Sequence, residues 1–368
     1  MNQRILLVTP ATPFSPRSGA QQRSALLHAA LGRLGVVDVL LLEPGSGPTR
    51  SLPADAGVIA RIQWRSRPLG LGKYRPDRQV SALLSAAGIV LDAYDLVVGR
   101  YLNTLCKLQL PAAARTVVDL DDWAYQYSAG GGSFSDHLKS AYAAWLARRQ
   151  LGRFNAFFVV SPRDAASLSG LTATVLPNIP FAPPSEPYPA MSSRTLLFVG
   201  ALWYPPNRAG IERFLARSWP AIRAACPDAK LSLIGAAPPA LRATWEQSPG
   251  VSAPGYVDDI DSAYRHAAFS IAPLHAGGGT NIKILESLAY GRACVTTPHC
   301  ATAFEADLGG AGLFVAGDDQ ALARACVDWL SDPEKPARTA IEGHAAVSAC
   351  FTRARFEQQV RRLCASAT

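Results

Sequence analysis

The chain has 368 residues, of which 49% are hydrophobic and 17% are charged, and its formal net charge is +8. This composition excludes a disordered chain, and the length predicts two domains rather than one. No apolar run is long enough to cross a membrane, and the apolar run at 5–8 is too short for a signal peptide. Seven cysteines without a C-x-x-C pair indicate neither a disulfide framework nor a zinc site, so we expect a reduced, cytoplasmic protein.

The first half of the chain alternates short apolar runs with helical patterns. Strands are expected at 5–9, 36–42, 58–63, 96–99, 116–119 and 157–161, with helices at 20–34 and 138–151 among the connections. This alternation predicts a parallel sheet that is covered by helices on both faces. Six prolines between residues 177 and 189 interrupt the pattern and predict a linker, which we place at 181–194.

The second half repeats the arrangement, with strands expected at 196–199, 230–234, 269–272, 293–296 and 312–315. We therefore predict an α/β protein of two doubly wound, Rossmann-like domains, 1–180 and 195–350, that face a cleft. Ligands of such sheets bind at the carboxyl ends of the strands. A last helix at about 351–368 has an apolar face formed by Phe356, Val360, Leu363 and Cys364.

The segment 272–297 carries the strongest functional signal. It reads as a strand, a turn, a helix and a second strand, and its turn contains Gly277, Gly278 and Gly279. Glycines before a helix let a ligand approach the backbone, and the unpaired amides of the helix favour an anion such as a phosphate. We expect Thr280 to be the N-cap, and Lys283 and Glu286 to share one face of the helix. An ordinary surface Lys–Glu pair is the alternative interpretation.

Together with the Gly-Arg-Ala-Cys-Val that follows the helix, this stretch resembles the nucleotide-sugar site of retaining glycosyltransferases of the GT-B fold, family 4. The resemblance implies that Glu286 holds the ribose hydroxyls of the donor. It also implies that the diphosphate is held by Lys283 and by the amides of Gly279, Thr280 and Asn281. The family often has a first glutamate, separated from the second by seven residues, and this chain has Gly278 there. The resemblance therefore predicts nucleotide binding but leaves the sugar open. In GT-B proteins a terminal helix crosses back to the first domain, so we expect the last helix to pack there.

A second loop that matches the family begins at Gly200, at the end of the strand at 196–199. A glycine here would let a diphosphate come close. The positions that commonly hold Arg and Lys in the family are Leu202 and Asn207 in this chain. We therefore expect Lys283, and Arg208 beside Asn207, to supply the positive charge for the diphosphate.

Two more loops match the family less specifically. The resemblance implies that the nucleobase meets backbone groups of Tyr256 and Val257, although a strand that ends in a polar turn explains this segment equally well. In the first half, Gly19 opens a helix where the family has a glycine loop that approaches donor and acceptor. The alternative for Gly19 is a routine strand-to-helix turn.

Acidic residues follow the strand at 116–119, in the order Asp119-Leu-Asp121-Asp122-Trp123. A D-x-D pair can ligate Mg²⁺ or Mn²⁺. That motif belongs to transferases of the GT-A fold, which nothing else in the chain resembles, so we expect no metal and no cofactor. We assign Asp121 and Asp122 to the acceptor side, where they would orient a hydroxyl or act as a general base. Helix capping with charge balance is the alternative.

The excess positive charge lies in the first half, where residues 1–182 contain 19 Lys and Arg against 11 Asp and Glu. Within it, the segment 61–78 interleaves six basic residues with Trp64 and Tyr74. This mixture predicts peripheral contact with the inner face of a membrane, or a lipid-linked or anionic acceptor. No nucleic-acid-binding module is apparent. A solvated basic loop is the alternative.

The sequence therefore predicts a glycosyltransferase that moves a sugar from a nucleotide diphosphate sugar to a hydroxyl acceptor, with retention, in polysaccharide or glycoconjugate synthesis. The residues expected to be catalytic are Lys283, Glu286, Asp121 and Asp122. An aspartate base on the opposite face of the sugar would make the enzyme inverting instead. Two other functions stay open: a nucleotide-sugar epimerase of the GT-B fold, and a degenerate subunit that binds the donor without turning it over.

Overall fold

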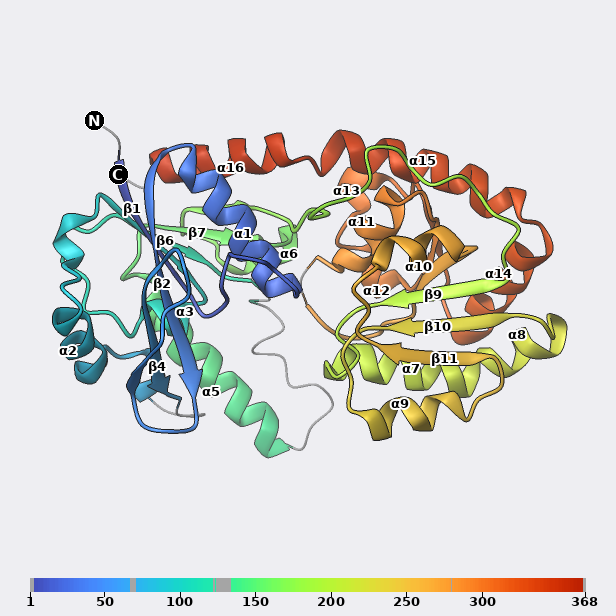
Figure 1. Ribbon diagram of the computed structural model, residues 1–368, viewed down its shortest axis with the longest axis horizontal. Coiled ribbons are helices and arrows are strands. Elements are labelled where there is room, and N and C mark those ends of the chain that lie inside the picture. Colours follow the sequence, from blue (N-terminus) through green and yellow to red (C-terminus); the bar gives the residue numbers. More distant parts are fainter. Residues whose placement is uncertain (1–2, 67–70, 122, 124–133, 279, 367–368) are drawn as a thin grey trace. The chain divides into compact units, whose positions relative to one another are not determined.

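Figure 1 shows the computed structural model, which describes residues 3–66, 71–121, 123, 134–278 and 280–366. The chain forms two compact units, each with its own sheet. Unit 1 combines Met1–Asn178 with Arg353–Thr368, and unit 2 is the continuous stretch Ile179–Thr352. The first division falls two residues before the predicted end of the first domain, at residue 180. The last helix belongs to unit 1.

Unit 1 is built on an eight-stranded sheet in the order β3-β4-β2-β1-β5-β6-β7-β8. Only β3 runs antiparallel to its neighbour, and the other pairs are parallel. The strands are β1 (Gln3–Thr9), β2 (Gly35–Gly45), β3 (Arg50–Leu52), β4 (Val58–Arg65), β5 (Leu96–Arg100), β6 (Thr116–Asp119), β7 (Ala156–Val159) and β8 (Ala173–Val175). The order reverses between β1 and β5, which is where ligands of such sheets bind.

Helices cover both faces of this sheet, as the continuous apolar runs of its central strands require. On one face α1 packs against α16, and on the other α5 contributes Leu146, Ala147 and Leu151 to a core with Val97, Val118 and Phe157. The helices of unit 1 are α1 (Gly19–Gly32), α2 (Arg78–Ala86), α3 (Leu102–Leu105), α5 (Phe134–Leu151), α6 (Pro162–Ser167) and α16 (Arg353–Ser366), with short 3₁₀ turns η1 (Leu71–Tyr74) and η2 (Leu91–Ala93).

Unit 2 is built on a six-stranded, wholly parallel sheet in the order β11-β10-β9-β12-β13-β14. Its strands are β9 (Thr195–Val199), β10 (Lys230–Ile234), β11 (Val251–Gly255), β12 (Phe269–Ala272), β13 (Cys294–Thr296) and β14 (Leu313–Val315). Here the order reverses between β9 and β12. The predicted fold class, two Rossmann-like domains with parallel sheets, is confirmed.

The helices of unit 2 follow its strands in turn. They are α7 (Pro205–Arg217), α8 (Trp219–Ala225), α9 (Pro239–Glu246), α10 (Ile260–His266), α11 (Ile282–Ala289), α12 (Pro298–Ala301), α13 (Glu305–Leu308), α14 (Asp319–Ser331) and α15 (Glu334–Cys350). Within the described ranges, no helix combines the length and the apolar character that crossing a membrane requires.

The proline-rich segment predicted as a linker belongs to unit 2 and is fastened to it. The buried guanidinium of Arg292 donates hydrogen bonds to the carbonyls of Tyr188 and Pro189, at 2.8 and 3.0 Å. The amide of Tyr188 in turn donates to the carbonyl of Tyr290. Residues 187–189 are therefore held as part of the unit rather than as a free connection.

Candidate active site

The predicted donor residues of unit 2 gather at the point where its strand order reverses. Gly200 directly follows β9, and the loop that leads to α11 follows β12. A Cβ added to Gly200 would lie 3.2 Å from Nδ2 of Asn207 and 3.4 Å from Cε of Lys283. The side chains of Asn207, from the start of α7, and of Lys283, from α11, therefore both lie against the backbone of Gly200.

Glycines remove side chains from three neighbouring strand ends in unit 2. Gly235, which the sequence analysis missed, follows β10 with a φ of +141°, and its amide donates to the carbonyl of Gly255 at 2.8 Å. A Cβ on Gly235 would come within 1.7 Å of the carbonyl oxygen of Gly200. A side chain cannot fit between these strand ends. The signal for Gly235 was its position directly after an apolar run.

The start of α11 differs from the prediction. Thr280 was expected to be the N-cap, but the helix begins at Ile282 and Asn281 occupies the cap position. Thr280 lies one residue too early and is buried. The side chain of Asn281 makes no capping hydrogen bond and instead accepts one from Nζ of Lys283 at 3.5 Å. The side chain of the cap residue therefore accepts from none of the amides of α11, while the amide of Ile284 donates to the backbone carbonyl of Asn281 at 2.9 Å. The start of a helix is a place where backbone amides can bind an anion.

The turn before α11 is only partly described. Gly277 has a φ of +123°, and a Cβ there would lie 3.3 Å from Cβ of Pro206 at the start of α7. Gly278 is half-buried, and Gly279 lies outside the described residues. The left-handed backbone at Gly277 explains why a glycine is needed at this point of the turn.

Glu286 lies one turn into α11, beside the buried stripe of Ile284, Leu285 and Leu288 that the sequence predicted. Burial raises the pKa of its carboxyl to about 7, although the ammonium of Lys283 acts in the opposite direction. The phenol of Tyr264 is buried, and its hydroxyl has no hydrogen-bond partner among the residues that the structure describes. Burial first, and then the charge of Glu286, raise the pKa of Tyr264. Glu286 is thus a carboxyl that changes protonation near neutral pH.

Positive charge is scarce in the rest of the predicted diphosphate loop. Leu202 is fully buried, and Nδ2 of Asn207 donates to the carbonyl of Ala201 at 2.8 Å. Arg208 is exposed, and its Nε pairs with Oε1 of Glu212 at 2.8 Å. Lys283 is therefore the cation that lies against Gly200.

The two residues predicted beside the nucleobase follow β11. Tyr256 is 53% exposed, whereas Val257 is half-buried against an apolar cluster that includes Leu197, Ile234 and Tyr264. Tyr264 connects the two regions, since it interacts electrostatically with Glu286 as well. Contact of a base with the backbone at 256–257 stays a prediction.

The carboxyl edge of unit 1 is built in a different way, around buried ions. Asp119 at the end of β6 accepts from Nη2 of Arg23 at 2.6 Å and from Nε of Arg100 at 3.0 Å, and all three side chains are fully buried. Arg23 comes from α1 and Arg100 ends β5, so the cluster spans the reversal point of this sheet. Although burial opposes ionisation, the two guanidiniums hold the pKa of Asp119 below its usual value.

Asp121, a predicted acceptor residue, is tied to this cluster. Its Oδ2 accepts from Nη2 of Arg100 at 2.7 Å, which fixes a largely buried carboxylate. Tyr101, which follows Arg100, has a φ of +64°, a strained backbone of the kind found at functional sites. Gly19 is the first residue of α1, four positions before Arg23. Asp122 lies outside the described residues.

The metal interpretation of the Asp119–Asp122 stretch finds no support in the geometry of Asp119. Both of its carboxylate oxygens accept hydrogen bonds from guanidiniums. Among the residues that the structure describes, no group of three or more His, Cys, Asp or Glu side chains is arranged to hold a metal ion.

The interpretation of the basic segment 61–78 as a membrane-binding surface is wrong in one respect. Its aromatic residues face inward: Trp64 is fully buried under the ammonium of Lys107, 4.5 Å from the ring centroid, and Tyr74 is buried as well. Arg61 pairs with Glu43 at 2.9 Å. Arg61 and Arg65 alternate with the buried Ile62 and Trp64 because β4 turns every second side chain toward the core, whereas Tyr74 lies on the 3₁₀ turn η1.

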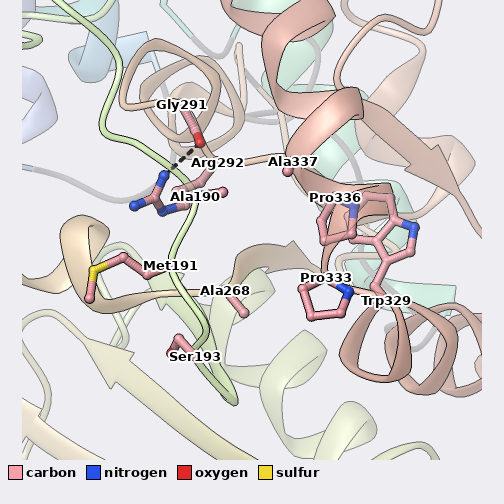
Figure 2. Close-up of a pocket in the computed structure, with 10 residues that line it drawn as sticks. All are labelled: Ala190, Met191, Ser193, Ala268, Gly291, Arg292, Trp329, Pro333, Pro336 and Ala337. Atoms are coloured by element: carbon pink, nitrogen blue, oxygen red, sulfur yellow. Dashed lines mark hydrogen bonds between the residues drawn. The ribbon is translucent and has the colours of Figure 1, made fainter.

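A small pocket in unit 2 lies apart from these residues. Figure 2 shows its lining, which combines the segment at 190–193 with Ala268, Gly291 and Arg292 and with the start of α15. The guanidinium of Arg292 is committed to backbone carbonyls, including that of Gly291. None of the predicted site residues lines this pocket, so we assign it no role in the chemistry.

Comparison with known proteins agrees with this geometry. Residues 193–332 match the family model described as glycosyl transferases group 1. Unit 2 is a glycosyltransferase domain. A search of curated proteins gave no match. The predicted assignment to the glycosyltransferases is confirmed, while membership of family 4 stays a prediction.

Solved structures that resemble the whole chain share its two-domain fold. A sucrose-phosphate synthase from Thermosynechococcus elongatus is 18% identical over 98% of both chains, with a TM-score of 0.69. WaaG, a glycosyltransferase involved in lipopolysaccharide biosynthesis, is 15% identical over 98% of this chain and 99% of its own, with a TM-score of 0.66. HepE from Anabaena, solved with UDP and glucose, is 17% identical over 99% of this chain and 100% of its own, with a TM-score of 0.65. The fold is GT-B, as predicted.

Proposed function

We propose that the chain transfers a sugar from a nucleoside diphosphate to a hydroxyl acceptor with retention, in the synthesis of a polysaccharide or glycoconjugate. One observation carries the proposal. Gly200, Asn207 and Lys283 converge at the reversal point of a glycosyltransferase domain, beside a helix whose cap residue makes no side-chain cap. The likeness to a structure solved with UDP and glucose supports the donor class.

The donor diphosphate would lie between Gly200 and the start of α11. There the helix amides and the ammonium of Lys283 would stabilise the charge that develops on the leaving diphosphate, which is electrostatic catalysis. Each charge-assisted hydrogen bond of this kind is worth about 1.5–3 kcal/mol. With Arg208 paired to Glu212, most of this contribution would rest on Lys283.

Glu286 would accept hydrogen bonds from the two ribose hydroxyls. This contact lies far from the reacting carbon, so its binding energy would fix the donor in position rather than act on the bond that breaks. The ionised carboxylate is the acceptor in such contacts, and its raised pKa makes the interaction dependent on pH near neutrality.

The acceptor would be held on unit 1, with Asp121 orienting its hydroxyl through a carboxylate that Arg100 keeps in place. In the retaining reaction the bond from the anomeric carbon to the diphosphate oxygen breaks and the acceptor oxygen bonds on the same face. The acceptor proton then passes to a phosphate oxygen of the leaving group. The excess of basic residues in the first half favours an acceptor that is anionic or lipid-linked, with peripheral contact at a membrane.

A specific observation also favours a degenerate donor-binding subunit as the second candidate. The two positions that commonly carry cations in the family hold a buried leucine and an amide that is bonded to Ala201. Such a protein would bind the nucleotide with less charge than a working enzyme uses.

The test is nucleotide release from a panel of UDP-, GDP- and TDP-sugars, with and without membrane extract. Release that depends on the extract supports transfer. Release without any acceptor indicates an epimerase-like or hydrolytic enzyme, and binding without release indicates the degenerate subunit. The variant Lys283→Ala should abolish release, whereas Lys335→Ala, which removes an exposed lysine of α15 paired with Asp328, should not.

A further inference from the structure

One helix of unit 1 exposes a row of large apolar side chains. On α5, Leu138, Tyr142 and Trp145 are 57%, 47% and 50% exposed. The rings of Tyr142 and Trp145 stack at 6.0 Å, and the guanidinium of Arg149 lies 4.8 Å from the centroid of the Trp145 ring. At 3.6 residues per turn these four side chains fall within an arc of about 60° and extend over about 16 Å of helix.

The charges around this row have one sign. Lys139 and Arg148 are exposed, and helical spacing puts them about 80–100° to either side of the row. The acidic residue of α5, Asp136, comes before the row, and no acidic residue follows it to the end of the helix. An apolar stripe with aromatic residues in it and cations along its margins is the pattern of a helix that lies in the headgroup layer of a bilayer.

The folded core does not need this row. α5 is anchored from its other side by Leu146, Ala147 and Leu151, which are buried in the core of unit 1. Figure 1 shows α5 along the side of the sheet opposite α1 and α16. Exposing three large apolar side chains to water, two of them stacked on each other, does not stabilise the fold, so we infer a function in binding.

We propose that the exposed face of α5, formed by Leu138, Lys139, Tyr142, Trp145, Arg148 and Arg149, is a docking surface for an anionic phospholipid bilayer. The cations would lie among the phosphates while Tyr142 and Trp145 enter the interface, where such rings are favoured. The charge pattern decides the partner. A second copy of the chain would bring the same cations against themselves, whereas an anionic lipid surface complements them.

The inference rests on the proposed function for its purpose, because a lipid-linked acceptor would be presented at that surface. α5 follows β6 in the chain, and the carboxyl end of β6 carries Asp119 and leads to Asp121. The proposed bilayer-binding helix and the predicted acceptor residue Asp121 therefore belong to the same unit. Binding to vesicles needs no donor, so it can be tested separately from sugar transfer.

The experiment is flotation of the whole protein with vesicles of phosphatidylcholine, with and without phosphatidylglycerol. The wild type should float only with the anionic vesicles and should be released by high salt. The variant Arg148→Glu/Arg149→Glu should bind at least about 25-fold more weakly, since each basic residue near such a surface is worth about fivefold. The variant Tyr142→Ser/Trp145→Ser should bind about tenfold more weakly or worse.

The chain offers matched controls. Arg361→Glu/Arg362→Glu changes the same charge on α16, an exposed adjacent pair in the same unit, and Ile341→Ser removes an apolar side chain that is 71% exposed. Both should float like the wild type. If Arg361→Glu/Arg362→Glu loses as much vesicle binding as Arg148→Glu/Arg149→Glu, net charge alone explains the binding, and this result overturns the proposal. So does a wild type that ignores anionic vesicles, or one that is a dimer in sedimentation velocity and becomes a monomer in Tyr142→Ser/Trp145→Ser. Lost sugar transfer with intact flotation would instead count against the proposed function alone.

Discussion

The carboxyl edges of the two sheets use opposite materials at the same topological position. In unit 2 the three strands on one side of the reversal point, β9, β10 and β11, have Gly200, Gly235 and Gly255 at their carboxyl ends, so this part of the edge is backbone. In unit 1 the corresponding edge holds two buried guanidiniums and the carboxylate of Asp119. The ends of β9, β10 and β11 in unit 2 therefore lack side chains, whereas the edge of unit 1 is filled by ion pairs of the protein's own side chains.

The difference shows how one architecture serves two tasks. An edge that must admit a charged ligand is best built from backbone amides and a few cations, because the ligand provides the opposite charge. An edge that holds its own ion pairs is rigid and can position a side chain such as Asp121. We therefore expect the buried ion pairs of unit 1 to contribute to its stability. The charged side chain at the edge of unit 2, Lys283, should instead contribute to ligand binding.

The largest effect is expected from Asp119→Asn. It leaves Arg23 and Arg100 buried without their shared carboxylate, which should cost about 3–5 kcal/mol of the free energy of unfolding. Urea unfolding of the variant and the wild type measures it. The matched control is Asp328→Asn, whose partner Lys335 is exposed, and it should cost no more than about 1 kcal/mol. Similar losses in both variants would show that burial of the cluster does not matter.

Glu286 should link the stability of unit 2 to pH. Its pKa is about 7 in the folded protein against an ordinary 4.5, so the folded state holds the proton more tightly. Relative to Glu286→Gln, the wild type should lose roughly 3 kcal/mol as pH rises from about 4.5 to above 7, since one pKa unit corresponds to about 1.4 kcal/mol. Urea midpoints across that range measure it, and parallel curves for the two proteins would contradict the shift.

The binding of nucleotide should follow pH in the other direction. If the ribose hydroxyls donate to ionised Glu286, the affinity for UDP should rise about tenfold between pH 6 and 8, beyond the change seen for Glu286→Gln. Because Glu286→Gln cannot ionise at this position, the change of its UDP affinity with pH reports the titration of the nucleotide phosphate without that of Glu286. Glu286→Ala should weaken UDP, GDP or TDP at pH 8, and unchanged affinity by calorimetry would remove Glu286 from the ribose role.

Lys283→Ala tests the donor edge directly. Loss of one charge-assisted contact should weaken UDP binding by about 10–100-fold, or 1.5–3 kcal/mol, with little change in stability. Lys283→Arg should retain part of the affinity, and Lys335→Ala all of it. If the Lys283→Ala protein is less stable but binds UDP normally, the charge at this edge serves stability and not binding, which contradicts the difference drawn between the two edges.

The smallest effect is expected from chelation. If sugar transfer relies on helix amides and Lys283 for the diphosphate, the rate should be unchanged in EDTA. Activity that is lost in EDTA and restored by Mn²⁺ would revive the metal interpretation of the acidic stretch that begins at Asp119.

Much of the fold could be predicted because the central strands are buried on both faces and read as continuous apolar runs. The edge strands β3, β8 and β11 were missing from the expected strands. No residue of β3 or β8 is fully buried, and β11 buries only Ala253 and Gly255, so none of the three carries a continuous apolar run. Trp64 and Tyr74 were misread because a sequence does not tell which way an isolated aromatic residue faces in a basic segment.

The candidate site divides in the same way. Lys283 and Glu286 lie on one helix, and Gly200 ends a strand, so local spacing was enough to predict them. Arg23 and Arg100 lie in separate elements and meet only after α1 and β5 take their places, so no local pattern connects them. The hint for Arg100 was a charged residue that closes an otherwise apolar strand. The cap at Asn281 rather than Thr280 was out of reach because helix starts vary by a residue or two.

The place of α16 has a consequence for how the protein is made. This helix packs on α1, and the carbonyl of its Cys364 accepts from Nη2 of Arg115, yet it leaves the ribosome only after all of unit 2. Nascent unit 1 must wait with the apolar face of α1 uncovered, while the continuous chain of unit 2 can finish first. Unit 1 begins to be translated first but can finish folding only after α16 has been made. We therefore expect chaperones to matter most for the amino-terminal half during synthesis.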